Sequence, residues 1–178
     1  RMNYVIALLI GLFFPAFVIY LIDFFRSSIS GRQDVQAATD VPVIGHIVHN
    51  PHRSQQVVFD FPNSVVAESF RSLRTNFQFF SRADDHFVVL VTSLIKGEGK
   101  SFTSVNLGTV FAQNNKKVVV VDFDLRKARL HHYLDIDTDS GLSHYLSHRA
   151  DIGNVIFKSG IPGLDVIPSG PTPPNPSE

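Results

Sequence analysis

The chain contains no cysteine, and its charges cancel, with 16 Lys plus Arg against 16 Asp plus Glu among 178 residues. Without cysteine there are no disulfides and no thiolate metal sites, which suits a reducing compartment. Without a net charge, the composition gives no argument for a nucleic-acid partner or for an acidic one. The length is sufficient for one domain with a real core and some additional segments.

A long run without charge is the first strong feature that is present. Tyr4–Ile22, YVIALLIGLFFPAFVIYLI, spans 19 residues, or roughly 28 Å of helix at about 1.5 Å per residue. This predicts one transmembrane helix within residues 1–26, and Gly11 and Pro15 are tolerated in such helices. A secretory signal peptide or a buried core helix are the alternatives, but the run is long for either and no clear cleavage site follows. Arg26 and Arg32 favour a cytoplasmic location for the residues after about 26.

Residues 27–62 are polar and poorly periodic, which predicts a linker with one short extended piece, VPVIGHIV. Several histidines recur at regular spacing, and a metal site is one interpretation. Solvated histidines are the simpler interpretation, because nothing in the sequence fixes the geometry of these side chains. The histidines concerned are His46, His49 and His52, and the i, i+4 pair His144 and His148.

A helix is predicted from residue 63 to about Phe80, with Asn63 and Ser64 as candidate N-caps. Its apolar stripe consists of Val66, Phe70, Leu73 and Phe77. Three charged residues, Glu68, Arg71 and Arg74, cluster on a different side. Their spacing alone favours an ordinary solvated face with an ion pair worth a few tenths of a kcal/mol.

From Phe87 onward, apolar β-rich runs alternate with helical segments. Strands are expected at 87–91, 117–124 and 164–168, and helices at 100–114, 125–134 and 142–146. This alternation predicts an α/β fold, a parallel sheet with flanking helices of the P-loop NTPase type, within a domain covering residues 63–178. Both ends of the sequence look cut, so we expect the sheet to be incomplete.

The segment SLIKGEGKSF, residues 93–102, joins the first expected strand to the next helix. Gly97 and Gly99 give the backbone freedom to bring N–H groups close to a phosphate, and the helix N-terminus adds a favourable dipole. Lys100 can reach the β- and γ-phosphates, and the Ser101 hydroxyl can ligate Mg²⁺. The full P-loop pattern wants a glycine where Leu94 stands. The segment therefore predicts an ATP phosphate site formed by Lys96, Gly97, Glu98, Gly99, Lys100, Ser101 and Phe102.

The segment VVVVDFDLR places two carboxylates at the end of the second expected strand. Asp122 lies 22 residues after Lys100, and Asp124 follows it. Because ligands bind at the carboxyl ends of parallel strands, we expect both side chains near the glycine-containing loop. One carboxylate could orient Mg²⁺, with Asp122 and Ser101 as the metal-site candidates, and the other could accept a proton from an attacking hydroxyl. Lys100, Asp122 and Asp124 are thus the candidate catalytic residues.

Three motifs in order resemble those of bacterial tyrosine kinases fused to polysaccharide co-polymerase membrane domains. TSLIKGEGKSF resembles their Walker A segment, VVVVDFDLRKARLH their Walker A′ segment, and ESFRSLRTNFQFF carries their E-x-x-R-x-x-R helix. The apolar helix with VPVIGHI resembles the stretch that joins their second transmembrane helix to the kinase. Lys96 stands where relatives often have proline or a small residue.

The resemblance implies an ATP- and Mg²⁺-dependent kinase that autophosphorylates tyrosines between subunits of a homo-oligomeric ring at the bacterial inner membrane. It implies a role in the synthesis and export of capsular or extracellular polysaccharide, with a tyrosine phosphatase as a further partner. Glu68, Arg71 and Arg74 would lie at the subunit contact. The Walker B strand and the tyrosine cluster of such kinases would follow Glu178, so we expect the 178-residue chain alone to have little kinase activity.

Two other functions remain open at the level of sequence. One is an ATPase of the deviant P-loop group that positions cargo, although its signature lysine would stand where Ile95 is. The other is a chain-length regulator scaffold that binds nucleotide only to set its assembly state.

Overall fold

The computed structural model describes residues 2–24, 31–80, 86–125 and 129–172, with the side chains of residues 5, 7–9, 23, 78 and 80 excepted. The chain divides into two compact units, Arg1–Val43 and Ile44–Glu178. The first contains α1 (Met2–Phe24) and α2 (Arg32–Ala38). Helix α2 was not expected within the linker. At its start the Gly31 N–H donates to Asp34 Oδ2 at 3.1 Å.

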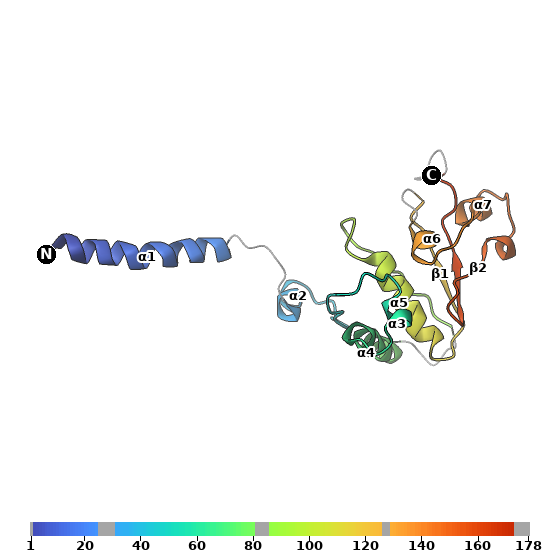
Figure 1. Ribbon diagram of the computed structural model, residues 1–178, viewed down its shortest axis with the longest axis horizontal. Helices are drawn as coiled ribbons and strands as arrows, with labels where there is room; N and C mark the ends of the chain where they lie inside the picture. Colours follow the sequence, from blue (N-terminus) through green and yellow to red (C-terminus); the bar gives the residue numbers. More distant parts are fainter. Residues whose placement is uncertain (1, 25–30, 81–85, 126–128, 173–178) are drawn as a thin grey trace. The chain divides into compact units, whose positions relative to one another are not determined.

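Helix α1 confirms that the apolar run at the N-terminus is helical, with Pro15 inside it. Figure 1 shows α1 as one long helix. Most of its described apolar side chains are exposed, among them Tyr4, Phe13 and Ile19. Among the described residues, however, no helix has both the length and the apolar character needed to cross a bilayer. The predicted transmembrane helix is therefore not found there, and Arg26, which was used to orient it, lies outside the described residues.

The second unit is built on a small sheet in the order β1-β3-β2. Strands β1 (Val118–Val121) and β3 (Leu164–Ile167) are parallel, with Val120 opposite Val166. Strand β2 (Phe157–Lys158) pairs antiparallel to β3. The expected strands at 117–124 and 164–168 are thus confirmed, although both are shorter than predicted, the second by one residue. The antiparallel pair was not predicted.

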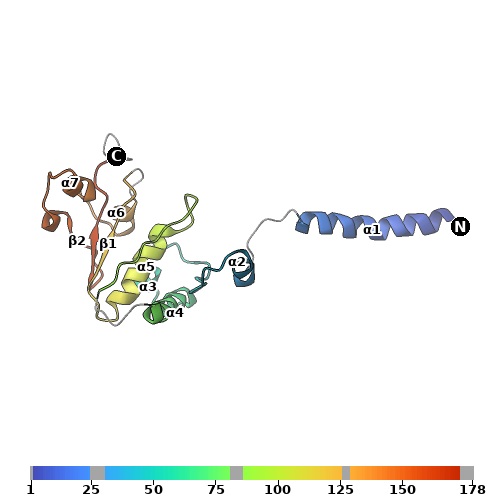
Figure 2. The ribbon, with the colours of Figure 1, turned by 180° about the vertical axis from the view of Figure 1, so that it is seen from behind.

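Both faces of this sheet are covered, which explains its continuous apolar sequences. On one face, Val120, Leu164 and Val166 pack against α5 (Lys100–Ala112). On the other face, Val121 and Ile167 pack against α7 (Leu142–Leu146) and the 3-10 turn at Ile152–Val155. Figures 1 and 2 show α5 and α7 on either side of the strands. Helix α6 (Leu130–Tyr133) is much shorter than the helix expected at 125–134, of which residues 126–128 are outside the described residues.

The strand predicted at 87–91 is wrong for the described structure. These residues have no regular secondary structure, and Val88 is 98% exposed. Phe87 still makes an edge contact with Phe111 on α5, at a ring separation of 5.2 Å. A short apolar run becomes a strand only when another strand satisfies its backbone groups. In the described sheet, β1 pairs with β3, and neither pairs with residues 87–91.

Helices α3 (Val57–Asp60) and α4 (Val65–Phe80) pack against α5 to complete the core. The predicted stripe on α4 is confirmed: Val66, Phe70 and Leu73 are buried, and Phe77 contacts Phe111. Ser64 is confirmed as a cap, since its Oγ accepts the Ala67 N–H at 3.1 Å. The linker is held on this helix, because Asn76 Nδ2 donates to the Ile44 carbonyl at 2.6 Å.

Replacement of Phe70 tests this packing. The ring is fully buried and contacts Phe102 edge-on at 5.8 Å. We expect Phe70→Ala to lower the free energy of unfolding by about 3–5 kcal/mol, because it removes apolar contact and leaves a cavity. Phe79→Ala on the same helix is the matched control, since Phe79 is 83% exposed. Equal denaturant midpoints for the two variants would contradict the assigned core.

Candidate functional site

The glycine-containing loop ends in left-handed backbone at two positions. Gly97 and Gly99 both have φ of +92°, a conformation that L side chains rarely adopt. Gly99 is the N-cap of α5, and its carbonyl accepts the Thr103 N–H at 2.8 Å. The two glycines predicted for backbone freedom therefore supply it. The helix N-terminus that follows carries Lys100 and Ser101 in its first turn.

Lys100 folds back over the loop that precedes it. Its Nζ donates to Ser93 Oγ at 2.8 Å, and Ser93 Oγ donates to the Ile95 carbonyl at 3.1 Å. The Ile95 N–H donates to Glu98 Oε2 at 3.2 Å. An ammonium group and a backbone N–H thus both bind oxygen atoms within this loop. These are the donor types that recognise phosphate oxygens.

The remaining predicted loop residues differ in their exposure. Lys96 is exposed and Ser101 is half-buried at the start of α5. The ring of Phe102 instead packs against Phe70 in the core. The side chain of Phe102 is therefore a core element, and only its backbone remains available for the role predicted from the sequence.

Asp122 is held directly after β1 by hydrogen bonds on both sides. Its N–H donates to the Ile167 carbonyl at 2.9 Å, which continues the pairing with β3. Its Oδ1 accepts the Asp124 N–H at 3.0 Å, and its Oδ2 accepts the Leu130 N–H at 3.3 Å, at the start of α6. Asp124 itself is exposed. Asp122 is thus the fixed carboxylate of the pair, and Asp124 is the accessible one.

Burial raises the pKa of Asp122 above its ordinary value of 3.8, because desolvation penalises the charged form. The backbone donors of Asp124, Leu130 and Arg129 act in the opposite direction, and the nearby charge of Asp124 raises the pKa further. A carboxylate whose charged state is disfavoured gains from a nearby cation, which is a property expected of a metal-site or acid–base residue.

The start of α5 and the carboxyl end of β1 lie on the same side of the second unit, which is the upper side in Figures 1 and 2. Lys100 is the first residue of α5, and Asp122 directly follows the last residue of β1. In the described contacts each is held by its own neighbours, Lys100 by Ser93 and Asp122 by backbone N–H groups. Within the described ranges no group of three or more His, Asp or Glu side chains is placed to hold a metal ion.

These residues fit a nucleotide with its Mg²⁺. Apart from the adjoining residues, no atom of the described residues lies within 4 Å of where a Cβ would stand on either glycine, so a phosphate can approach the backbone there. Mg²⁺ commonly keeps several waters and takes one or two carboxylates plus phosphate oxygens, so it does not need a cluster of protein ligands. Ser101 and Asp122 carry oxygen atoms of the type that would hold Mg²⁺ in such a site.

The three charged residues on α4 make contacts within the chain. Arg71 Nη1 pairs with Glu68 Oε2 at 2.9 Å, and its Nη2 donates to the Pro62 carbonyl. Arg74 Nη1 donates to the Val110 carbonyl of α5 at 3.2 Å. Glu68 and Arg71 thus remain at the surface, with side-chain exposures of 67% and 32%. Their predicted place at a subunit contact stays a prediction.

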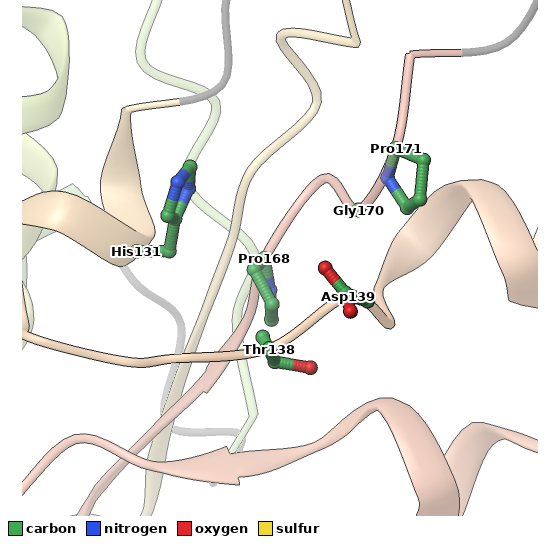
Figure 3. Close-up of a pocket in the computed structure, with 6 residues that line it drawn as sticks. All are labelled: His131, Thr138, Asp139, Pro168, Gly170 and Pro171. Carbon is green, nitrogen blue, oxygen red and sulfur yellow. The ribbon is translucent and has the colours of Figure 1, made fainter.

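A small open cavity of about 190 Å³ lies beside Asp122, and sequence reasoning missed it. Figure 3 shows its side chains coming from α6, from the 138–139 loop and from the segment after β3. Pro168 directly follows Ile167, and His131 directly follows Leu130, and both Ile167 and Leu130 bond Asp122. The only sequence signal was a proline- and glycine-rich segment after a strand. The lining residues are His131, Thr138, Asp139, Pro168, Gly170 and Pro171.

A parallel strand pair flanked by helices, with a left-handed glycine loop opening α5, defines an α/β fold of the P-loop NTPase type. A family model described as "AAA domain" matches residues 88–172, which include the loop, Asp122 and the cavity. Among solved structures, the kinase domain of the Escherichia coli tyrosine kinase ETK matches with a TM-score of 0.76 and 28% identity, over 84% of this chain and 63% of that one. The chimerical protein CapA2B2 matches with a TM-score of 0.69 and 33% identity, over 83% and 64%.

The chain is homologous to bacterial tyrosine-protein kinases. It is 30% identical to the tyrosine-protein kinase ptk of Acinetobacter johnsonii over 98% of its own length, and 41% identical to YwqD of Bacillus subtilis strain 168 over 66%. It spans 25% of the first protein and 49% of the second. The fold and the resemblance to these kinases, expected from three motifs, are confirmed, whereas the fused co-polymerase domain is not shown.

The pKa of Asp122 gives a prediction with a definite sign. A raised native pKa means that folding favours the protonated carboxyl, so wild-type stability falls as the pH rises through that pKa. The Asp122→Asn variant does not lose stability in this way, because the asparagine amide does not ionise. We therefore expect the free energy of unfolding of the variant, minus that of wild type, to increase between about pH 3.5 and pH 7.

Chemical denaturation at several pH values measures this difference, and a carboxyl NMR titration of Asp122 gives its native pKa independently. A difference that decreases with pH, or a titration midpoint below 3.8, would show that the donors of Asp124 and Leu130 outweigh burial.

Proposed function

We propose that this chain is the ATP-binding part of a protein-tyrosine kinase. The observation that carries the proposal is the loop at residues 93–101, in which two left-handed glycines lead into a helix with Lys100 in its first turn. Asp122 at the neighbouring strand end supplies the carboxylate. The homologous proteins ptk, YwqD and etk are tyrosine-protein kinases, which supports tyrosine as the acceptor.

Each residue then has a role that follows from its position. The N–H groups at the start of α5 and Lys100 bind the β- and γ-phosphates, where they offset the negative charge that develops during transfer. Ser101 and Asp122 hold Mg²⁺, which supplies further charge stabilisation when bound. The exposed Asp124 can accept the proton of the acceptor hydroxyl. The cavity beside Asp122 offers space for the acceptor side chain.

The proposal extends to the protein of which this chain is a part. Its biological role would be control of capsular or extracellular polysaccharide synthesis and export, with autophosphorylation between subunits of a ring and reversal by a tyrosine phosphatase. Glu68, Arg71 and Arg74 would contribute to the subunit contact. The surface position of Glu68 and Arg71 supports this role for them. Arg74, in contrast, already donates a hydrogen bond to α5 of its own chain.

Lys100→Met tests the phosphate role. Loss of a charged hydrogen-bond donor costs about 1.5–3 kcal/mol, so we expect the affinity for ATP with Mg²⁺ to fall about 10- to 100-fold. Titration calorimetry on the 178-residue chain measures this, and Lys117→Met, an exposed lysine after the far end of α5, is the matched control. In the full-length protein the same change should abolish phosphotyrosine. Unchanged ATP affinity would refute the site, and phosphate release without any phosphotyrosine would favour an ATPase.

We further propose that α1 attaches the protein to a membrane, because its exposed apolar side chains lose water contact there. Removal of residues 1–26 should then move the chain from the membrane fraction to the supernatant. Flotation with lipid vesicles measures this. If the intact chain does not float with vesicles, α1 is not a membrane anchor.

A further inference from the structure

One fully buried polar side chain of α5 joins two distant parts of the sequence. Asn106 is 0% exposed. Its Oδ1 accepts the Val58 N–H at 2.9 Å, and its Nδ2 donates to the carbonyls of Gln55 and Phe102, each at 2.8 Å. Both N–H groups of the side-chain amide are therefore used, and two of the three hydrogen bonds go to the linker. Breaking these bonds would leave a buried polar group without a partner, which is costly.

The position of Asn106 connects these bonds to the phosphate loop. It lies six residues after Lys100 on the same helix, which corresponds to roughly 9 Å along the axis. Val57 and Val58, beside the bonded groups, are 0% exposed and pack in the cluster formed with α4 and α5. The linker thus holds α5 through both polar and apolar contacts, close to the turn that carries Lys100.

The same short segment also reaches the Asp122 side of the site. Gln56 Nε2 donates to the Tyr133 carbonyl at the end of α6, at 2.7 Å. The first residue of α6, Leu130, donates its N–H to Asp122 Oδ2. Residues 55–58 are therefore bonded to the helix that carries Lys100 and to the helix that holds Asp122.

We infer that this linker clasp, formed by residues 55–58 with Asn106 and Tyr133, positions the two halves of the nucleotide site relative to each other. Asn106 and Gln56 are positioning residues, since they act through α5 and α6. The inference rests on the proposed nucleotide site. It implies that ATP binding and closure of the linker on the domain stabilise each other, because affinity coupling is reciprocal.

Hydrogen exchange on the 178-residue chain tests the coupling without any need for kinase activity. The Val58 N–H reports on the clasp directly, because it bonds Asn106 Oδ1. At an ATP concentration about 100 times Kd, an opening that abolishes binding is suppressed by up to about 100-fold. We expect exchange at Val58 to slow by tenfold or more. The Glu68 N–H in the first turn of α4, bonded to the Ser64 carbonyl just before the helix, serves as the internal reference and should change little.

Two variants separate positioning from general stability. Gln56→Ala removes the bond to Tyr133, and we expect it to weaken ATP binding several-fold and to reduce the protection of Val58 by ATP. Gln55→Ala is the matched control, because Gln55 contributes only its backbone carbonyl and its side chain is exposed. Asn106→Ala should have a larger effect than Gln56→Ala. If the Asn106→Ala variant does not fold, hydrogen exchange of the wild-type chain and the ATP affinity of Gln56→Ala still test the clasp.

The outcomes distinguish the two proposals. Wild-type chain that binds ATP without slower exchange at Val58 overturns the clasp and leaves the nucleotide site intact. Equal ATP affinity for wild type and Gln56→Ala also overturns it. Wild-type chain that does not bind ATP overturns the proposed function and the coupling with it.

Discussion

Burial of α5 is the constraint on which the rest of the second unit depends. Every residue from Val105 to Ala112 is buried, because the helix packs between the sheet and α4. Gly108 permits this close approach, since a Cβ there would lie 3.0 Å from side chains of both Leu164 and Val120. A helix is stiff over its 13 residues, so fixing its second half fixes the direction of its first turn. The direction of the turn that carries Lys100 is thus a consequence of core packing.

Much of the fold and of the candidate site could be predicted because the signals were local. The α4 stripe repeats at the helical period, and its buried residues are those of the pattern. Two glycines before a helix required a special backbone, and both adopt positive φ. Continuous apolar runs predicted β1 and β3, and both faces of these strands are covered in the structure. For the helix stripe and the glycine turn, the sequence within a few residues determines the conformation.

The features that could not be predicted depend on partners far away in the sequence. Residues 87–91 have the composition of a strand, but a strand also needs a neighbour for its N–H and C=O groups, and composition does not reveal whether one is present. Asn106 stands in an apolar helix with nothing nearby to mark it, because its partners lie 48 and 51 residues away. The cavity beside Asp122 likewise combines α6, a loop and the end of β3.

The arrangement also explains how a linker can influence a site that it does not enter. Asp122 sits at the end of β1, and Lys100 at the start of the helix packed on that strand, so small shifts of α5 along the sheet change their separation. The apolar contacts of α5 resist separation of the layers, but they are non-directional and resist sliding weakly. Hydrogen bonds have preferred directions and lengths. The hydrogen bonds of Asn106 to Val58 and Gln55 therefore fix how far α5 lies along its own axis. Burial of apolar side chains alone defines this position less well.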